Sequence, residues 1–310
     1  MSKGEICLSA SLIGLGNIGL GYDLIDGKFI GSAKSHVGAL LAIETFQTLN
    51  FVELNNHFNL RNNSFPNANK YEFQDFSQKT LQYDLLILAT PTHSHLGVIK
   101  QLLAHHSFKC AIVEKPCGVN LVECCGIVKL LETKGVLWYA NYFRSFLPNT
   151  LQAIGMAVRL GENPISAIIT GYDDLLNIFS HFIHLLTQFT EDFGSIATSR
   201  LINSETAQLT FQDGFNLKLR NIRGSRTDSP VLTILYPTFN LQFKNNGQTI
   251  EVLKNENGEL LETFSLPDFD RYQELATREF LSRFNSGRKE EYWRVEKVHE
   301  IVSAITLYYD

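Results

Sequence analysis

Residues 14–19 read GLGNIG, with the spacing G-x-G-x-x-G, and they follow the apolar stretch 6–13. An apolar stretch of this length predicts a buried strand, and the glycines stand where that strand would turn into a helix. In such a turn one glycine permits the tight bend, one lets the backbone approach a pyrophosphate, and one lets helix and strand pack closely. Phosphates bind there because backbone N–H groups at a helix N-terminus point toward them. The run therefore predicts dinucleotide binding, with a glycine-rich turn of another α/β protein as the alternative.

The composition places the chain among ordinary globular proteins of about two domains. It has 310 residues, of which 44% are hydrophobic and 19% charged. A net charge of −5 and a pI near 6.0 argue against nucleic acid as a partner. Five cysteines without a C-x-x-C pair indicate reduced thiols rather than a disulfide framework or a zinc site. No signal-peptide pattern and no membrane-length apolar run are present, so we expect a cytoplasmic protein without a membrane partner.

Strand-like and helix-like segments alternate through the first half of the chain. Wholly apolar runs such as 84–90 are typical of strands buried on both faces of a parallel sheet. The alternation predicts a doubly wound parallel sheet, a Rossmann domain, over residues 1–146. The strands expected after the first are 51–58, 84–90, 111–113 and 135–142, and the helices are 35–49, a segment through 98–103, and 119–134.

Beyond residue 146 the pattern changes to short alternating segments punctuated by turn residues. Asp213-Gly214 and Asn257-Gly258 are two of these turns. We expect an α+β domain with a largely antiparallel sheet over residues 147–310, serving substrate binding and oligomerisation. The expected strands are 165–170, 207–211, 215–219, 231–236, 238–243 and 250–253, and the expected helices are 151–160, 176–189, 272–284 and 295–308.

Three loops follow the carboxyl ends of expected parallel strands, where open α/β sheets bind ligands: 14–19, 91–95 and 114–116. Lys115 follows a buried strand directly, which is an unusual place for a merely solvated charge, although a surface lysine remains the alternative. His93 and His95 either solvate their loop or contact the cofactor.

One helix face in the second half carries Asn177, His181 and His184 at positions i, i+4 and i+7. Histidine is the natural proton carrier near neutral pH, whereas a pair of buried, hydrogen-bonded core histidines is the simpler alternative. A metal site is a further alternative, since His181 and His184 have H-x-x-H spacing and the loop at 91–95 contains H-x-H. No carboxylate or cysteine joins these histidines in a motif, so we expect no metal.

The second expected strand, 51–58, ends in asparagines rather than in an acidic residue. An Asp or Glu at this strand end usually holds the adenosine ribose of NAD. The only acid here is Glu53, which we expect inside the strand, and Arg61 would meet a 2′-phosphate. The sequence thus leaves NAD and NADP open as cofactors and favours tolerance of NADP(H).

Five segments together resemble the Gfo/Idh/MocA oxidoreductases, which include glucose-fructose oxidoreductase, inositol dehydrogenases and sugar-nucleotide dehydrogenases. They are GLGNIG (14–19), ATPTHSH (89–95), VEKPCG (113–118), ANYFRS (140–145) and NIFSHFIHLL (177–186). The resemblance implies a Rossmann domain, a second domain on a largely antiparallel sheet, and a bound NAD or NADP. It also implies a sugar, cyclitol or sugar-nucleotide substrate oxidised at a secondary alcohol. Parts of the pattern look like members associated with bacterial surface-polysaccharide synthesis.

The resemblance also implies roles for individual residues. Lys115 matches the motif lysine that reaches substrate and nicotinamide ribose, and His181 matches the general base on the substrate hydroxyl. The family's helix often reads D-x-x-x-H-x-x-D, but Asn177 and His184 occupy the acidic positions here. The implied substrate-binding residues are Asn177, His184, Tyr142 and Arg144, and the implied cofactor-binding residues are Gly14, Gly16, Asn17, Ile18, Thr90, Pro91, His95, Glu114 and Lys115.

These observations predict an NAD(P)-dependent oxidoreductase that transfers a hydride between a nicotinamide cofactor and a secondary alcohol of a sugar or sugar nucleotide. We expect a homo-oligomer, dimeric or tetrameric, with a small molecule as its other partner. The alternative is a catalytically silent relative that binds a nucleotide or sugar as a sensor or assembly partner. The sequence identifies neither the sugar nor the direction of the reaction.

Overall fold

The computed structural model describes residues 8–26, 28–54, 65, 68–171, 179–190, 193–221 and 231–309. The chain forms two compact units, and each unit takes its residues from two stretches of sequence. Unit 1 comprises 1–141 and 270–292, and unit 2 comprises 142–269 and 293–310. These units are groups of residues in mutual contact. The domain boundary expected after residue 146 stays a prediction.

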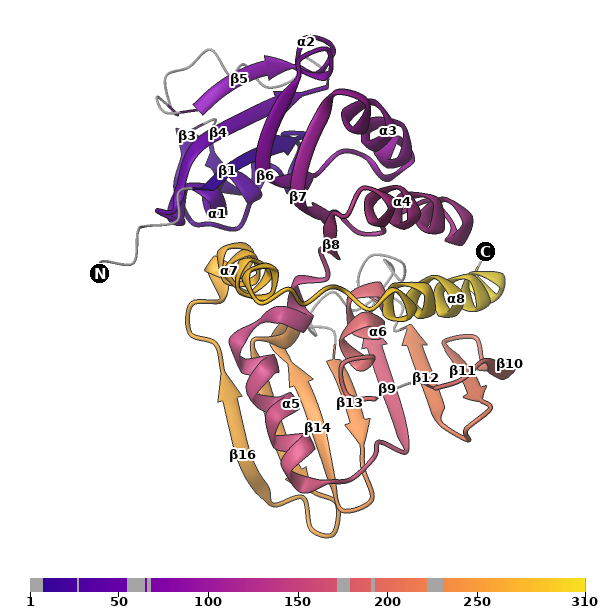
Figure 1. The fold of residues 1–310 in the computed structure, drawn as a ribbon. Helices are drawn as coiled ribbons and strands as arrows, with labels where there is room; N and C mark the ends of the chain where they lie inside the picture. Colours follow the sequence, from indigo (N-terminus) through magenta and orange to yellow (C-terminus); the bar gives the residue numbers. More distant parts are fainter. Residues whose placement is uncertain are drawn as a thin grey trace. The chain divides into compact units, whose positions relative to one another are not determined.

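Unit 1 is built on six parallel strands in the order β5-β4-β1-β6-β7-β8 (Figure 1). The apolar runs fill its centre, where Leu12, Leu86 and Ile112 are completely buried. This arrangement confirms the predicted doubly wound parallel sheet. The strands are β1 Leu8–Ile13, β4 Phe46–Glu53, β5 Ala68–Glu72, β6 Leu81–Leu88, β7 His106–Val113 and β8 Leu137–Ala140.

Helices and a small hairpin connect these strands. Helices α3 and α4 pack against each other beside β7 and β8, and α7 packs on α1 (Figure 1). Helix α4 begins with a reciprocal cap, in which Asn120 Oδ1 accepts from Glu123 N and the Glu123 carboxylate accepts from Val119 N. The elements are η1 Gly21–Asp23, β2 Leu24–Ile25, β3 Lys28–Phe29, α1 His36–Ala42, α2 Phe73–Ser77, η2 Thr92–Ser94, α3 His95–His105, α4 Leu121–Thr133, η6 Phe269–Arg271 and α7 Tyr272–Asn285.

The first helix and the second long strand differ from expectation. Helix α1 ends at Ala42, and β4 begins at Phe46, inside the expected helix 35–49. Aromatic and β-branched residues in 45–52 favour a strand, and the sheet decides the matter because β4 runs in parallel register beside β1. The expected strand 51–58 was therefore wrong in position. Strand β5, Ala68–Glu72, was not among the strands expected from the sequence.

The glycine turn leads into a single helical turn rather than a long helix. Leu20 N donates to Gly16 O at 2.9 Å, and Tyr22 N donates to Asn17 O at 2.8 Å. The short helix η1 follows, and the next α-helix begins only at His36. The first α-helix thus begins close to residue 35, where the sequence predicted it, and not directly at the glycines. What remains for a phosphate is the open backbone of the turn rather than the dipole of a full helix.

The buried carboxylate of Asp23 explains how α1 is held. It accepts hydrogen bonds from Lys34 N at 3.1 Å, Ser35 N at 3.0 Å and Ser35 Oγ at 2.6 Å. Ser35 in turn caps the helix by accepting from Gly38 N. Gly38 is required there, because a Cβ at this position would lie 2.0 Å from Asp23 Oδ2.

Unit 2 contains an eight-stranded sheet in the order β10-β11-β12-β9-β13-β14-β15-β16 (Figure 1). Only the β9–β12 pair within this sheet is parallel, which confirms a largely antiparallel sheet. Residues alternate between buried and partly exposed along the central strands, as expected for a sheet with one covered face. The strands are β9 Ser166–Gly171, β10 Ile196–Asn203, β11 Thr206–Phe211, β12 Asn216–Asn221, β13 Val231–Leu235, β14 Phe239–Lys244, β15 Thr249–Lys254 and β16 Leu260–Ser265.

Helices predicted near 151–160 and 295–308 are present as α5 Pro148–Leu160 and α8 Tyr292–Tyr309. The helix predicted over 176–189 is described as α6 Ser180–Leu186, while residues 172–178 lie outside the described part. The described residues of this unit also form the short helices η3 Phe143–Phe146 and η5 Asn245–Gly247.

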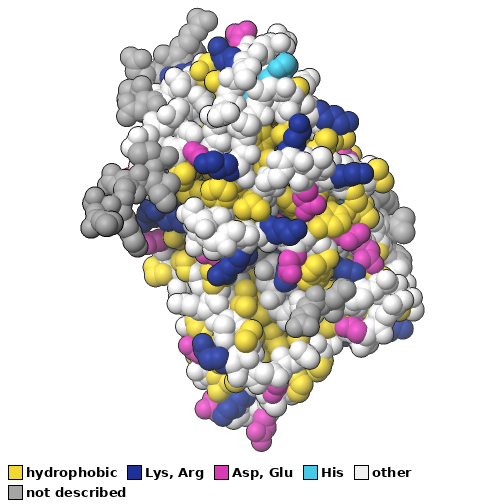
Figure 2. All heavy atoms as spheres, viewed as in Figure 1, with side chains coloured by type: hydrophobic (Ala, Val, Ile, Leu, Met, Phe, Trp, Pro, Cys, Tyr) yellow, Lys and Arg dark blue, Asp and Glu magenta, His cyan; other side chains and the backbone are white. Residues whose placement is uncertain are grey.

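Two general properties bear on partners. No helix within the described ranges has the length and apolar character needed to cross a membrane. On the face drawn in Figure 2, Lys and Arg side chains are interspersed with Asp and Glu.

Asp84 joins three neighbouring strands and provides a test of the sheet. Its carboxylate accepts from Ser9 N at 2.9 Å, Ser9 Oγ at 3.0 Å and Lys109 Nζ at 2.7 Å. Burial alone would raise the pKa of Asp84, but the hydrogen bonds from Lys109 and Ser9 outweigh burial and lower it.

We expect Asp84→Ala to reduce the free energy of unfolding by about 1–3 kcal/mol, because it leaves Ser9 N–H without its acceptor. Since the folded pKa is lowered, the advantage of the wild type should be complete above pH ~4 and decline as the pH falls through the folded pKa. Urea unfolding of both proteins over a pH series measures this. A difference that stays constant down to the acid transition would contradict the prediction.

Candidate functional site

The three motif glycines meet different surroundings. Gly14 has φ +94°, and a Cβ there would lie 2.6 Å from Ala89 O on the neighbouring strand's loop. A Cβ on Gly19 would lie 2.2 Å from Gly14 O. At Gly16, by contrast, a Cβ meets nothing within 4 Å. Two glycines are therefore required by packing, whereas the third leaves open space beside the backbone.

The backbone donors of this turn divide in the same way. Gly14 N donates to Val52 O at 2.8 Å, and Leu15 N donates to Glu53 Oε2 at 3.3 Å. Within the described residues, the N–H groups of Gly16, Asn17 and Ile18 donate to no protein acceptor. Open space beside Gly16, together with N–H groups that have no protein acceptor among the described residues, suits a pyrophosphate. The turn therefore has the chemistry that a dinucleotide requires.

Glu53 lies within β4, as expected, but it is the last residue of that strand. Strand β4 lies earlier in the sequence than the expected strand. Its carboxyl end, and with it the Glu53 carboxylate, is therefore beside the glycine turn. Its Oε2 accepts from Leu15 N, and its Oε1 accepts from Leu54 N at 2.8 Å. An acid therefore occupies the strand end at which NAD-binding folds hold the ribose. Arg61 and residues 55–60 lie outside the described part of the chain.

The second loop is held by His95. This side chain is fully buried, with Nε2 2.9 Å from Thr90 O and Nδ1 3.0 Å from Cys117 O. Ser94 Oγ lies 2.9 Å from Thr90 Oγ1, which adds a local tie within the loop. His95 thus links the loop after β6 to the loop after β7. His93 is exposed, as expected for a residue that solvates its loop, while Pro91 is exposed at the loop surface.

The third loop contains a buried carboxylate next to the motif lysine. Glu114 Oε1 lies 2.8 Å from His36 Nε2 and also accepts from Asn141 Nδ2, while its Oε2 accepts from Lys115 N at 3.2 Å. Burial would raise the pKa of Glu114, but hydrogen bonds and charge from His36, together with Asn141, lower it. Glu114 is therefore a fixed anion beneath Lys115, whose own side chain is half-buried.

In unit 2, the histidines of α6 lie in an aromatic cluster with η3. The His184 ring stacks on Tyr142 with centroids 4.4 Å apart, and its Nδ1 lies 2.7 Å from Ser145 Oγ. The His181 ring meets Tyr142 and Phe143 edge-on at 5.6 and 5.0 Å. His184 is completely buried, whereas His181 retains 6% exposure. Of the three polar residues expected on one face, Asn177 lies outside the described residues.

Arg144 makes a structural tie within unit 2. Its Nε donates to Asn246 O at 3.0 Å and its Nη2 to Asn246 Oδ1, and the guanidinium lies 4.5 Å from the Phe143 ring centre. The same turn is held by Asn149, whose Nδ2 donates to Gly247 O at 2.8 Å. These contacts fix η5 beside η3. The predicted role of Arg144 toward an anionic substrate stays a prediction.

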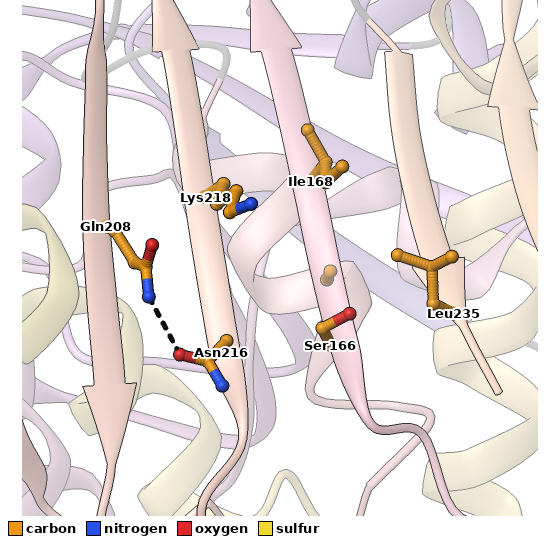
Figure 3. Close-up of a pocket in the computed structure, with 7 residues that line it drawn as sticks. Ser166, Ile168, Gln208, Asn216, Lys218 and Leu235 are labelled. Carbon is orange, nitrogen blue, oxygen red and sulfur yellow. Dashed lines mark hydrogen bonds between the residues drawn. The ribbon is translucent and has the colours of Figure 1, made fainter. Parts of the chain in front are cut away.

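A separate hollow of about 360 Å³ lies on the sheet of unit 2 (Figure 3). Strands β9, β11, β12 and β13 form it, and the side chains of Gln208 and Asn216 are joined by a hydrogen bond of 2.9 Å at its edge. None of the candidate site residues lines it. Among the described residues, no three His, Cys, Asp or Glu side chains gather in a way that would hold a metal ion.

The sequence did not single out His36 and Asn141, which the structure places around Glu114. Asn141 directly follows β8, so its strand-end position was an available signal. His36 had a weaker signal, namely a polar residue after the capping Ser35 at the start of an apolar helix.

Comparisons with known proteins agree with this geometry. Residues 8–142 match the model of an oxidoreductase family with an NAD-binding Rossmann fold, GFO_IDH_MocA. No curated protein sequence matches the chain.

Several solved structures share the fold at low sequence identity. A super-repressor mutant of Gal80p from Saccharomyces cerevisiae is 15% identical, with a TM-score of 0.75 over 97% of this chain and 95% of its own. UDP-N-acetylglucosamine 3-dehydrogenase GnnA from Acidithiobacillus ferrooxidans is 15% identical, with a TM-score of 0.70 over 98% of this chain and 97% of its own. A mutant of KijD10 is 14% identical, with a TM-score of 0.71 over 96% of each chain. KijD10 is a 3-ketoreductase from Actinomadura kijaniata, and that structure is a complex with TDP-benzene and NADP.

The family match covers β1 through β8, including the glycine turn and the Lys115 loop. Residues 8–142 are thus similar to the Gfo/Idh/MocA oxidoreductases, a family described by its NAD-binding Rossmann fold.

Proposed function

We propose that this protein is a nicotinamide-dependent dehydrogenase or reductase acting on a secondary alcohol of a sugar or sugar nucleotide. The observation that carries the proposal is the open glycine turn, with N–H donors at Gly16, Asn17 and Ile18, at the same sheet edge as the Lys115 loop. The family match supports hydride transfer, and the names of GnnA and KijD10 favour sugar-nucleotide chemistry. The cytoplasmic location and the homo-oligomeric state expected from the sequence remain part of this proposal.

The chain's own residues would divide the chemistry as follows. The bound nicotinamide supplies the hydride acceptor or donor. His181 takes the hydroxyl proton of the substrate in the oxidising direction, since histidine titrates near neutral pH. Lys115 donates a charged hydrogen bond to the oxygen on which negative charge develops, above the fixed Glu114 carboxylate. Asn177 and Tyr142 orient the substrate, and His184 supports Tyr142 by stacking.

We further propose NAD(H) as the preferred cofactor. Glu53 ends β4 beside the glycine turn, where a carboxylate accepts hydrogen bonds from the ribose hydroxyls and repels a 2′-phosphate. This revises the tolerance of NADP(H) expected from the sequence, which rested on an absent strand-end acid.

A second candidate function is a regulatory protein that binds a nucleotide or sugar without turnover. Its support is the likeness to the Gal80p super-repressor, together with Asn177 and His184 at positions where the family often has acids. Retention of Lys115 and His181 favours the enzyme. Binding of NADH without oxidation or reduction of any sugar nucleotide in a broad panel would favour the regulator.

The glycine turn gives the first test of cofactor binding. Gly16→Val should abolish NADH binding, because the new side chain fills the space beside the open N–H groups, yet it should not unfold the protein. NADH fluorescence titration and urea unfolding measure the two effects. Gly155→Val, at another uncrowded glycine in α5, is the matched control and should bind normally. Unchanged NADH affinity in folded Gly16→Val would refute a dinucleotide at this turn.

Cofactor choice gives the second test. Wild-type protein should bind NADH about a hundredfold more tightly than NADPH, a difference of roughly 2.7 kcal/mol. Glu53→Gln should reduce that preference to about tenfold or less, because it removes the charge that repels the 2′-phosphate. Competitive titration with both dinucleotides measures the ratio. Equal affinity of the wild type for NADH and NADPH would show that Glu53 does not discriminate.

Kinetics with a turned-over sugar nucleotide give the third test. Lys115→Ala and His181→Ala should each lower kcat by about a hundredfold or more, the scale of a positioned acid–base group. NADH affinity should be unchanged in His181→Ala, which would touch substrate only. The double variant should lose less than the product of the two single losses, since residues acting in one step are not additive. Full activity of His181→Ala would leave that histidine as a packing residue.

A further inference from the structure

His36 lies between the glycine turn and the lysine loop. Its backbone N–H donates to Ile18 O at 2.9 Å, and the next residue's N–H, at Val37, donates to Gly19 O at 2.9 Å. Its side chain is fully buried, and its Nε2 lies 2.8 Å from Glu114 Oε1. Because an ionised carboxylate only accepts, Nε2 carries the hydrogen of this bond.

The Glu114 carboxylate is the next link. Its Oε1 accepts hydrogen bonds from His36 Nε2 and Asn141 Nδ2, and its Oε2 accepts one from the backbone N–H of Lys115 at 3.2 Å. Asn141 is itself fixed by Gln273 of α7, whose Oε1 accepts from Asn141 Nδ2 at 3.0 Å. A buried carboxylate that loses a donor is costly, so removing the His36 bond would force Glu114, and the Lys115 backbone with it, to move.

We propose that His36 is a positioning residue for Lys115, acting through Glu114. The chain of bonds runs from the carbonyls of the glycine turn, through the first turn of α1 and the His36 ring, to Glu114 and the Lys115 N–H. His36 thereby fixes the lysine loop relative to the turn that holds the dinucleotide, and it touches neither substrate nor cofactor. The inference rests on the proposed function.

A purely structural role makes a different prediction from a positioning role. A structural histidine would affect stability alone, whereas a positioning histidine affects cofactor binding only as long as Lys115 is present. The second outcome is measurable without a known substrate, because Lys115 is proposed to reach the nicotinamide ribose.

The experiment is a double-mutant cycle on NADH affinity in the full chain. His36→Leu removes the donor at similar size and should weaken NADH binding by about tenfold. His36→Gln keeps an amide donor near the Nε2 position and should restore affinity to within about threefold of wild type. In a Lys115→Ala background, His36→Leu should cause no further loss, since its effect passes through the lysine.

His106 supplies the matched control. It is also buried in unit 1, and its Nε2 lies 3.1 Å from Phe76 O, at the amino end of β7 rather than the carboxyl end. His106→Leu should reduce the free energy of unfolding yet leave NADH affinity within about threefold of wild type. If His36→Leu does not fold, Glu114→Gln takes its place in the cycle, with the same expected loss and the same dependence on Lys115.

The outcomes separate the inference from the function on which it rests. If wild-type protein binds neither NADH nor NADPH, the proposed function fails and the inference falls with it. If wild-type protein binds NADH but His36→Leu binds equally well, only the inference is overturned. An equal loss in the wild-type and Lys115→Ala backgrounds would also overturn it, because His36 would then act independently of the lysine.

Discussion

Unit 1 depends on satisfying one buried carboxylate. A charge at the position of Glu114 costs several kcal/mol unless hydrogen-bond donors surround it. The donors come from separate segments: His36 from α1, Asn141 from the end of β8, and the backbone of Lys115. Helix α7 joins this network through Gln273, which accepts a hydrogen bond from Asn141 although it lies 132 residues later in the sequence. The network explains why a helix from the end of the sequence belongs to the Rossmann unit.

The glycine turn shows the complementary constraint, since here the structure leaves polar groups unsatisfied. Gly14 and Gly19 are required because neighbouring backbone atoms occupy the space of a side chain, and they bring β1 against the loop after β6. That close packing presents the N–H groups around Gly16 to open space. The hydrogen-bonded Glu114 carboxylate and the open N–H groups around Gly16 lie at the same edge of one sheet. This edge of the sheet therefore combines a hydrogen-bonded carboxylate with a turn whose N–H groups face open space.

The sequence predicted those parts of this arrangement that are encoded locally. Apolar runs located the central strands, and glycine spacing located the turn after β1, because each depends on neighbouring residues only. The position of β4 was misplaced because the helix expected from residue 35 was extended through 49, whereas pairing with β1 starts a strand at Phe46. The sequence therefore did not show that Glu53, which it placed within the strand, is the last residue of that strand. His36 was missed because its partner Glu114 is 78 residues away, and the local signal, a polar residue after the capping Ser35, does not identify that partner.

The departures on α6 also have a physical reading. His184, at a position that the resemblance compares with an acid, is fully buried, stacked on Tyr142 and hydrogen-bonded to the Ser145 hydroxyl. A carboxylate in that aromatic surrounding would need a compensating charge, whereas an imidazole ring can both stack on Tyr142 and hydrogen-bond to Ser145. The aromatic packing around η3 therefore accommodates an imidazole at position 184 better than a carboxylate. Because His181 is the less buried of the two histidines, the buried position of His184 does not argue against the catalytic role proposed for His181.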